Sequence, residues 1–241
     1  MNQIAFATTA AACMASSFLA AAPAAHAADA RQQPVTRVET KQKAVALTFD
    51  DGPNPENAPK YLKLFKDEGV KATFFVVGNN VARQADLAKQ MIAAGHEIGN
   101  HSMDHANLAQ LKTEEDVRGN IARAQAAVKD ATGVEPKVFR APYIAHDEKT
   151  WRVLGALQLP SVGARLDTRD WDGKSTVASI TDAATLTADA GDIVLMHEWN
   201  AKTLEAMPEI IRRLKAKGLA FVTVSGLLEI DKPKPPAAHG K

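Results

Sequence analysis

Residues 45–53 read VALTFDDGP, a short apolar run that ends in two carboxylates and a Gly-Pro pair. The run Val45–Phe49 is almost continuously apolar, which is typical of a strand buried on both faces of a parallel sheet. Asp50 and Asp51 stand where that strand ends. In extended backbone their side chains point in different directions, so one can bind a cation while the other stays free as a base. A simple turn over residues 50–53 is the alternative interpretation, because Asp, Gly and Pro are the usual turn residues.

Six further apolar runs predict strands that alternate with helices along the chain. These strands are expected at residues 72–77, 96–99, 161–164, 193–196 and 219–224, and one more begins at residues 138–139. The helices have recognisable ends: Pro59 suits a first turn, Gly69 ends that helix, Thr113 with Asp116 resembles a capping box, and Asp147 suits an N-cap. This alternation predicts a parallel α/β architecture, either a barrel or an open doubly wound sheet.

Polar residues stand where the predicted strands end, and this placement favours the barrel. In a parallel barrel all strand ends point to the same C-terminal rim, where such barrels place their chemistry. The rim residues expected on this basis are Asp50, Asp51, His101, Arg140, Asp167, Asp170 and His197.

The pair His101 and His105 predicts a metal site together with Asp51. Two imidazoles four residues apart reach one ion if the segment is helical or tightly turned. With one carboxylate they form a ligand set that leaves coordination positions open for water and substrate. Zinc is the default ion, and cobalt or nickel would suit the same ligands. Two surface histidines near a helix start are the alternative.

His197 follows the apolar run 193–196, and a lone histidine in this position is most simply a core residue at the strand end whose hydrogen bonds are satisfied. Its expected place on the same rim as the metal site favours a general acid instead. Arg140 and Asp170 are then expected partners, one for a carboxylate and one for an imidazole. Their alternative is a surface salt bridge, which contributes about 0–1 kcal/mol.

The composition and the two ends of the chain set the domain organisation. Among 241 residues, 29 Lys and Arg balance 28 Asp and Glu, which argues against a mainly phosphate-driven nucleic-acid binder. Residues 1–27 are predicted to be a signal peptide, since an uncharged apolar stretch ends at the small-x-small pattern of residues 25–27. A membrane anchor and lipidation of Cys13 are the alternatives.

Residues 28–43 are predicted to be a linker, residues 44–230 the catalytic domain, and residues 231–241 a disordered Pro-rich tail. We therefore expect a secreted or periplasmic protein without stable membrane insertion after cleavage of the signal. The oligomeric state is left open.

An ordered set of motifs resembles the polysaccharide deacetylases of carbohydrate esterase family four, from about Val45 to Leu228. The matching motifs lie at residues 48–52, 101–105, 140–143, 170–171 and 195–197. The resemblance implies a distorted parallel β/α barrel with about seven strand-helix units. It also implies site roles: Asp50 as catalytic base, Asp51 with His101 and His105 as metal ligands, and His197 as catalytic acid.

The resemblance implies further roles around these groups. Arg140 would orient the base and Asp170 the acid, and the backbone N–H of Tyr143 would bind the oxyanion. The residues expected to contact substrate are Pro142, Tyr143, Trp171 and Leu195. Trp171, Trp199 and Tyr143 could stack on sugar faces, or they could be packing residues.

The implied activity is a zinc-dependent removal of N-acetyl groups from N-acetylglucosamine polysaccharide, either peptidoglycan or chitin-type chains. Metal-activated water would attack the acetyl carbonyl, with an Asp base and a His acid. One alternative is an O-acetyl esterase on an acetylated xylan-type glycan. A non-catalytic sugar-binding barrel is another, and metal storage or sensing is a distant third.

Overall fold

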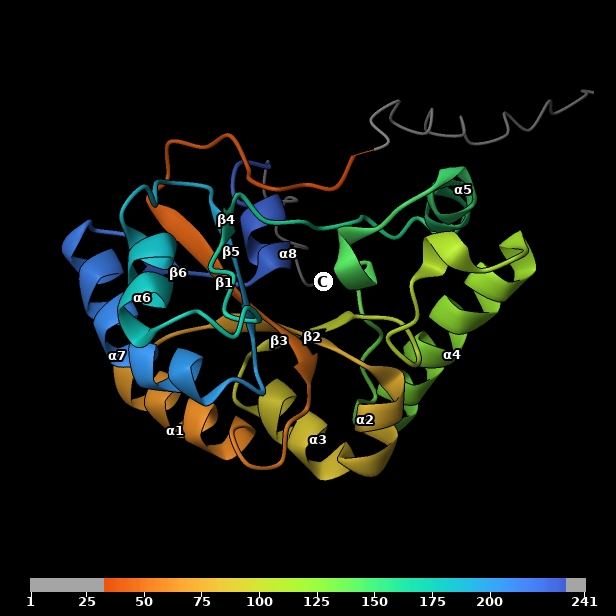
Figure 1. The fold of residues 1–241 in the computed structure, drawn as a ribbon, viewed down its shortest axis with the longest axis horizontal. Helices are drawn as coiled ribbons and strands as arrows, with labels where there is room; N and C mark the ends of the chain where they lie inside the picture. Colours follow the sequence, from red (N-terminus) through yellow and green to blue (C-terminus); the bar gives the residue numbers. More distant parts are fainter. Residues whose placement is uncertain (1–32, 233–241) are drawn as a thin grey trace, which may run out of the picture. The chain divides into compact units, whose positions relative to one another are not determined.

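The computed structural model describes residues 33–232, and these form a parallel sheet covered by helices (Figure 1). The sheet order is β3-β2-β1-β5-β4, and β6 pairs with β1 outside this path. All of these pairings are parallel, so the predicted α/β class is confirmed. The strands are β1 (Ala44–Gly52), β2 (Ala72–Val76), β3 (Glu97–Asn100), β4 (Leu166–Asp167), β5 (Ile193–His197) and β6 (Ala220–Phe221).

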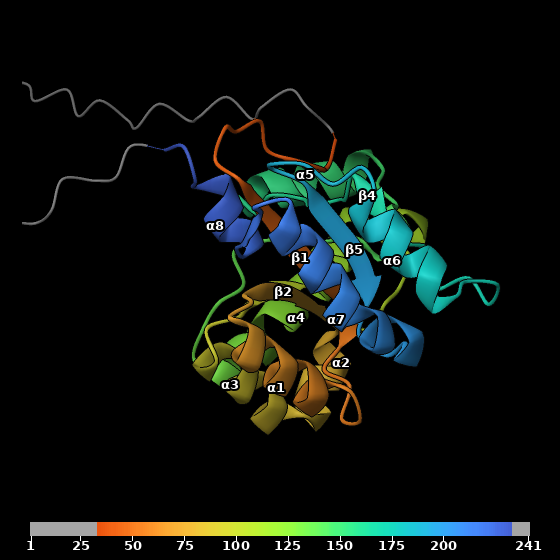
Figure 2. The ribbon, with the colours of Figure 1, turned by 90° about the vertical axis from the view of Figure 1, so that its left-hand side faces the viewer.

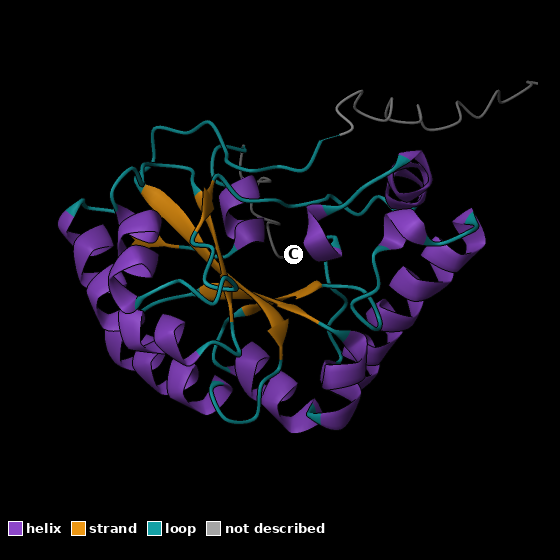
Figure 3. Cartoon of the chain, in the orientation of Figure 1, coloured by secondary structure: helices purple, strands orange, loops and turns teal. Residues whose placement is uncertain are grey.

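The helices follow one another around the outside of the sheet (Figure 3). Helices α6 and α7 lie side by side next to β4 and β5, as Figure 2 shows from a second direction. The α-helices are α1 (Ala58–Glu68), α2 (Gly78–Arg83), α3 (Ala85–Ala93), α4 (Glu114–Thr132), α5 (Glu148–Ala156), α6 (Val177–Thr185), α7 (Ala201–Ala216) and α8 (Val224–Leu228). Two 3-10 turns, η1 (Leu108–Gln110) and η2 (Pro142–Ile144), complete them.

Beyond β3 the sheet continues only as single bridges, so it does not close into a regular barrel. Phe139 bridges to Asn100 on one side and to Ser161 on the other. The prediction of strands at residues 138–139 and 161–164 is therefore wrong, since these segments form only isolated bridges. Proline explains this, because Pro142 and Pro160 lie close to the bridging residues and have no N–H for a ladder.

The start of the described chain lies in the gap beside these bridges. Val35 donates its N–H to the Ser161 carbonyl and Val38 donates to the Gly191 carbonyl, over 2.9 and 2.8 Å. Residues 35–38, within the segment predicted as a linker, thus pack between residues 161–163 and the start of β5. The predicted signal at 1–27 and residues 233–241 of the predicted tail lie outside the described residues. Within the described part of the chain, no helix has the length and apolarity needed to cross a membrane.

Several predicted helix ends are confirmed. Thr113 and Asp116 form a reciprocal capping box at the start of α4, and Asp147 caps α5. Gly69 ends α1 in a left-handed conformation with φ of 67°. The strand predicted at 219–224 is shorter than expected, because Thr223 caps α8 and so starts a helix there.

An aromatic cluster packs α1 onto the central strands and supports the end of β1. The ring of Phe49 lies 4.8 Å from Tyr61, 5.7 Å from Phe65 and 5.4 Å from Phe74, measured between centroids. His96 meets the Phe74 ring edge-on in the same cluster. Burial lowers the pKa of His96 to about 4, so this histidine is a neutral core residue.

Gly191 tests the packing of the segment 35–38 against the sheet. Its φ is +84°, and a Cβ there would lie 1.7 Å from the Val38 carbonyl oxygen. We expect Gly191→Ala to destabilise the protein by about 2–4 kcal/mol, measured by thermal unfolding. Gly155→Ala is the matched control, because this exposed α5 position has open space and should gain about 0.5–1 kcal/mol. An unchanged melting temperature for Gly191→Ala would contradict the packing described.

Candidate active site

The carboxyl ends of β1, β3 and β5 open into one pocket of about 420 Å³. Five of the seven residues expected at the rim line this pocket. The lining residues are Asp50, Asp51, His101, His105, Ala141, Tyr143, Ile144, Asp167, Trp171, Leu195, His197 and Trp199. Arg140 and Asp170 stand behind this wall and contact Asp50 and His197.

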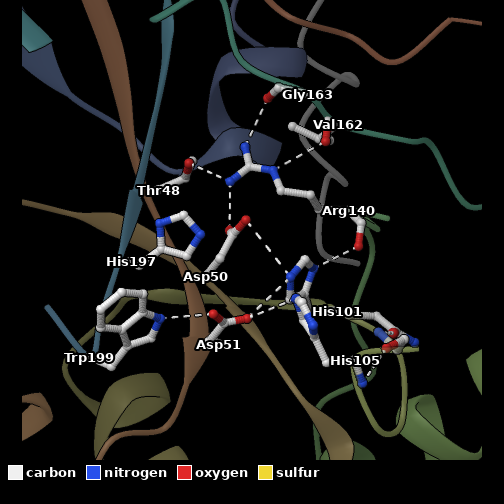
Figure 4. A network of polar contacts seen from close by, with 12 residues as sticks. Thr48, Asp50, Asp51, His101, His105, Arg140, Val162, Gly163, His197 and Trp199 are labelled. Carbon is white, nitrogen blue, oxygen red and sulfur yellow. Dashed lines mark hydrogen bonds and ion pairs between the residues drawn. The ribbon is translucent and has the colours of Figure 1, made fainter. Parts of the chain in front are cut away.

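Asp51, His101 and His105 converge on one point in the pocket (Figure 4). Asp51 Oδ1 lies 3.5 Å from His101 Nε2 and 3.2 Å from His105 Nε2. This buried oxygen has no hydrogen-bond partner among the described residues, despite those close contacts. A carboxylate oxygen left unpaired beside two imidazole nitrogens is a donor set that fits a divalent cation such as zinc.

The protonation of Asp51 and His105, and the orientation of the His101 ring, suit a metal site. Burial alone would raise the pKa of Asp51, but its close contacts with His101, His105 and Trp199 outweigh burial and hold the pKa well below its usual range. Burial and the neighbouring His101 lower the pKa of His105, which favours the neutral imidazole. His101 Nδ1 lies 2.8 Å from the Arg140 carbonyl oxygen, so its Nε2 is the nitrogen that faces the site.

An irregularity in β1 aims both carboxylates at the same pocket. The pairing of β1 with β2 shifts register between Asp50 and Gly52, and Asp51 has a left-handed φ of 71°. The sequence had led us to expect an extended backbone at Asp51, and this expectation is wrong. A bulge of this kind re-aims a side chain that regular alternation would send to the other face.

The two histidines sit on a tight turn, not on a helix. Ser102 and His105 have φ of 66° and 59°. Ser102 accepts a hydrogen bond from the His105 N–H over 2.9 Å, and Asn100 accepts one from the Ser102 N–H over 2.8 Å. Asn120 on α4 accepts the N–H of Met103 over 2.7 Å. These side chains fix the turn that brings the histidines together.

Arg140 holds Asp50 from behind. Its Nη1 lies 2.7 Å from Asp50 Oδ1 and donates to the Thr48 hydroxyl at the same distance. The guanidinium is fully buried, and it donates further to the Val162 and Gly163 carbonyls. This is a buried ion pair in which nearly every donor is used, not a surface salt bridge.

Asp170 holds His197 in the same manner. Asp170 Oδ1 lies 2.7 Å from His197 Nδ1, and its Oδ2 accepts the His197 N–H and the Thr203 hydroxyl. Burial lowers the pKa of His197, but the Asp170 bond and the charges of Asp50 and Asp170 outweigh it, so the net shift is upward. His197 is thus favoured as an imidazolium whose Nε2 remains available.

Exposed aromatic side chains surround the pocket mouth. Tyr143, Trp171 and Trp199 are 68%, 49% and 44% exposed. Tyr143 has a φ of 59° and packs its ring against His105, while Trp199 donates its Nε1–H to Asp51 Oδ2 over 2.9 Å. Leu195 lines the pocket as expected, but Pro142 is buried at the start of η2 and is not among the lining residues.

Sequence reasoning missed three participants in this site. Ile144 gave no chemical signal, and Trp199 was considered only as a stacking or packing residue. Glu198 received no role, although an acidic residue directly after His197 was a signal that could have been followed. Its side chain is fully buried beneath the site, and burial raises its pKa to about 8.

Comparison with known proteins agrees with this geometry. Residues 37–162 match a family model described as polysaccharide deacetylase. A peptidoglycan-N-acetylglucosamine deacetylase from Listeria monocytogenes is 37% identical over 185 residues, which cover 77% of this chain and 39% of that protein. A bifunctional xylanase/deacetylase from Pseudobutyrivibrio xylanivorans is 33% identical over 197 residues, which cover 80% of this chain and 32% of that protein.

A solved structure is similar as well. The family 4 carbohydrate esterase from Streptomyces lividans in complex with acetate superimposes with a TM-score of 0.71 and 33% identity, over 74% of this chain and 91% of that one. The chain spans about two fifths of the Listeria relative and a third of the xylanase relative. The matched model, the shared fold and the ordered site motifs together show that this chain belongs to the polysaccharide deacetylase family, carbohydrate esterase family four.

Proposed function

We propose that the protein is a zinc-dependent hydrolase that removes N-acetyl groups from N-acetylglucosamine-containing polysaccharide, either peptidoglycan or chitin-type chains. One observation carries the proposal. Asp51 Oδ1, buried and without a hydrogen-bond partner among the described residues, faces two histidine nitrogens in the pocket that also holds Asp50 and His197. The Listeria relative, named for deacetylation of peptidoglycan N-acetylglucosamine, supports the choice of substrate.

Zinc held by Asp51, His101 and His105 would supply a Lewis acid that polarises the acetyl carbonyl and makes water nucleophilic near neutral pH. Asp50 takes the proton of the attacking water. Arg140 keeps this carboxylate aimed into the pocket through the 2.7 Å contact.

His197 completes the reaction on the other side of the pocket. As the carbon–nitrogen bond breaks, Nε2 of the imidazolium donates its proton to the leaving amine, and acetate remains. Asp170 holds Nδ1 and so orients the ring. The backbone N–H of Tyr143 binds the developing oxyanion, and Leu195 lines the space for the acetyl methyl group. Trp171 and Tyr143 at the pocket mouth offer faces on which sugar rings can stack.

A second candidate is O-acetyl esterase activity on an acetylated xylan-type glycan. The bifunctional xylanase/deacetylase relative favours it, and the same site would hydrolyse an ester more easily than an amide. Acetate release from chitooligosaccharides and from acetylated xylo-oligosaccharides, followed in parallel by mass spectrometry, separates the two. We expect release from the N-acetylated chains, and release from xylan alone would replace the first proposal by the second. No release from either, with zinc bound, would favour a sugar-binding barrel.

We extend the proposal to a secreted or periplasmic location. The support is the signal pattern of residues 1–27 and a substrate that lies outside the cytoplasm.

Removal of one metal ligand should abolish metal binding and activity together. We expect His105→Ala to lower zinc affinity at least about tenfold, since only two protein ligands remain. Elemental analysis after dialysis and acetate release measure the two effects. His146→Gln is the control, because His146 bonds Ser161 and is not among the residues that line the pocket. A His105→Ala protein with full zinc content would remove His105 from the ligand set.

Loss of the base should separate chemistry from metal binding. Asp50→Asn removes the proton acceptor but no proposed metal ligand, so kcat should fall by about 10²–10⁴. In His197→Ala, kcat should fall by a similar factor because the acid is lost. Zinc content stays at the wild-type level in both. A kcat close to the wild-type value in either variant would show that the role assigned to that residue is wrong.

Asp170→Asn should move the pH profile in a defined direction. Asp170 is the main group that raises the pKa of His197, so its loss lowers that pKa. His197 acts as an acid only while protonated, and the alkaline limb of kcat should therefore shift to lower pH. The nearby Asp172→Asn is the control with an unchanged profile. A shift to higher pH, or none, would contradict the role of His197 as acid.

A further inference from the structure

Glu198 is a buried carboxyl group that the proposed reaction does not use. It lies between His197 and Trp199 and has no exposed surface. Among the described residues it forms no ion pair, and its Oε2 has no hydrogen-bond partner. Burial raises its pKa to about 8, against the hydrogen bond from Asn54, so the group is mostly neutral near pH 7.

The carboxyl group packs against the turn that follows Asp51. The Asn54 N–H donates to Glu198 Oε1 over 3.0 Å. At Gly52, an added Cβ would lie 1.8 Å from Glu198 Oε2. Gly52 does not have a left-handed φ, so the carboxyl group, rather than backbone strain, is what excludes a side chain at this position. Glu198 and the metal-ligand turn are thus in direct contact.

The main chain of the same residue is tied to the other end of the turn. The Glu198 N–H donates to the Asp50 carbonyl over 3.1 Å, next to the register pair of Asp50 with His197. Asn57 Nδ2 donates to the carbonyls of Glu198 and Trp199, both at 3.1 Å. Trp199 in turn holds Asp51 Oδ2 through its indole N–H. Glu198 is therefore bonded to the proposed base Asp50 through its backbone N–H and follows the proposed acid His197 in the chain. It also precedes Trp199, which holds the proposed metal ligand Asp51.

We propose that Glu198 is a positioning residue whose buried side chain, acting as a hydrogen-bond acceptor of fixed shape, holds the turn at residues 51–54 so that Asp51 faces His101 and His105. This inference rests on the proposed metal site and deepens it. The carboxyl group touches neither substrate nor the reacting atoms, so its effect passes through Asp51 and the turn.

The side chain's shape and acceptor are tested with two substitutions at Glu198. Glu198→Ala leaves the Asn54 N–H unpaired and opens space below Gly52, so zinc affinity should fall about 10–100-fold. Glu198→Gln keeps an oxygen for Asn54 and nearly the same shape, so affinity should stay within about threefold of wild type. Glu205→Ala, on the exposed side of α7, is the matched control. Zinc affinity is read by competition with a chromogenic chelator, using the full chain, with thermal unfolding as the check on folding.

A double-mutant cycle tests the contact itself and does not depend on Glu198→Ala alone. Gly52→Ala drives a methyl group into the carboxyl group and should lower zinc affinity. In Gly52→Ala/Glu198→Ala that methyl group enters the space left by the side chain, so the two losses should not multiply. Independent, multiplying losses would overturn the proposal, as would wild-type affinity in Glu198→Ala. Glu198→Gln as weak as Glu198→Ala would also overturn it, because the charge would then matter rather than the acceptor.

Activity gives a second readout. For Glu198→Ala at saturating zinc we expect a lower kcat with KM nearly unchanged, since Glu198 is not among the residues that line the pocket. A change confined to KM would contradict a positioning role. If the wild-type protein releases no acetate, the proposed function fails, yet the zinc affinities still decide the role of Glu198.

Discussion

Two adjacent negative charges at the buried end of β1 are the constraint on which the site depends. Carboxylates taken out of water are stable only when other groups compensate them. Asp50 is compensated by the fully buried Arg140, whose remaining donors are fixed by carbonyl groups of residues 162 and 163. Asp51 has two imidazoles and an indole N–H instead, and one of its oxygens still lacks a hydrogen bond. That difference supports the separate roles proposed for Asp50 and Asp51.

The same constraint explains why segments far apart in sequence meet at this place. The compensating groups come from the turn after β3, from the bridge region at 139–140 and from the end of β5. Each segment is fixed locally by hydrogen bonds, such as those of Ser102 and Asn120 around the histidine turn. The site is therefore held in place by hydrogen bonds within the chain itself, which is the form of preorganisation that favours catalysis.

Much of this arrangement could be predicted from the sequence, because the strongest signals are local. Long apolar runs predicted β1, β2 and β5, and polar residues at their ends predicted the rim. The Thr113–Asp116 capping box and Gly69 predicted helix ends for the same reason. Residue type and position at the end of a strand were enough to predict Asp50, Asp51 and His197 as site residues.

The parts that sequence reasoning missed depend on tertiary context. The left-handed Asp51 backbone is set by the bulge against β2, and nothing in the sequence of that dipeptide requires it. The segments at 138–139 and 161–164 have apolar residues but also nearby prolines, which limit them to single bridges. Glu198 received no role from the sequence. Its buried carboxyl group packs against Gly52, a residue 146 positions earlier in the chain that only the folded structure brings into contact with it.

We propose that Asp51, His101 and His105 together hold the metal on which the other groups act. Anomalous scattering at the zinc edge, from crystals of the zinc-loaded protein, tests it most directly. We expect one strong peak within about 2.0–2.2 Å of Asp51 Oδ1 and of Nε2 in both histidines, with Asp50 outside the ligand set. A peak bound by Asp50 in place of Asp51, or no peak between these three residues, would contradict it.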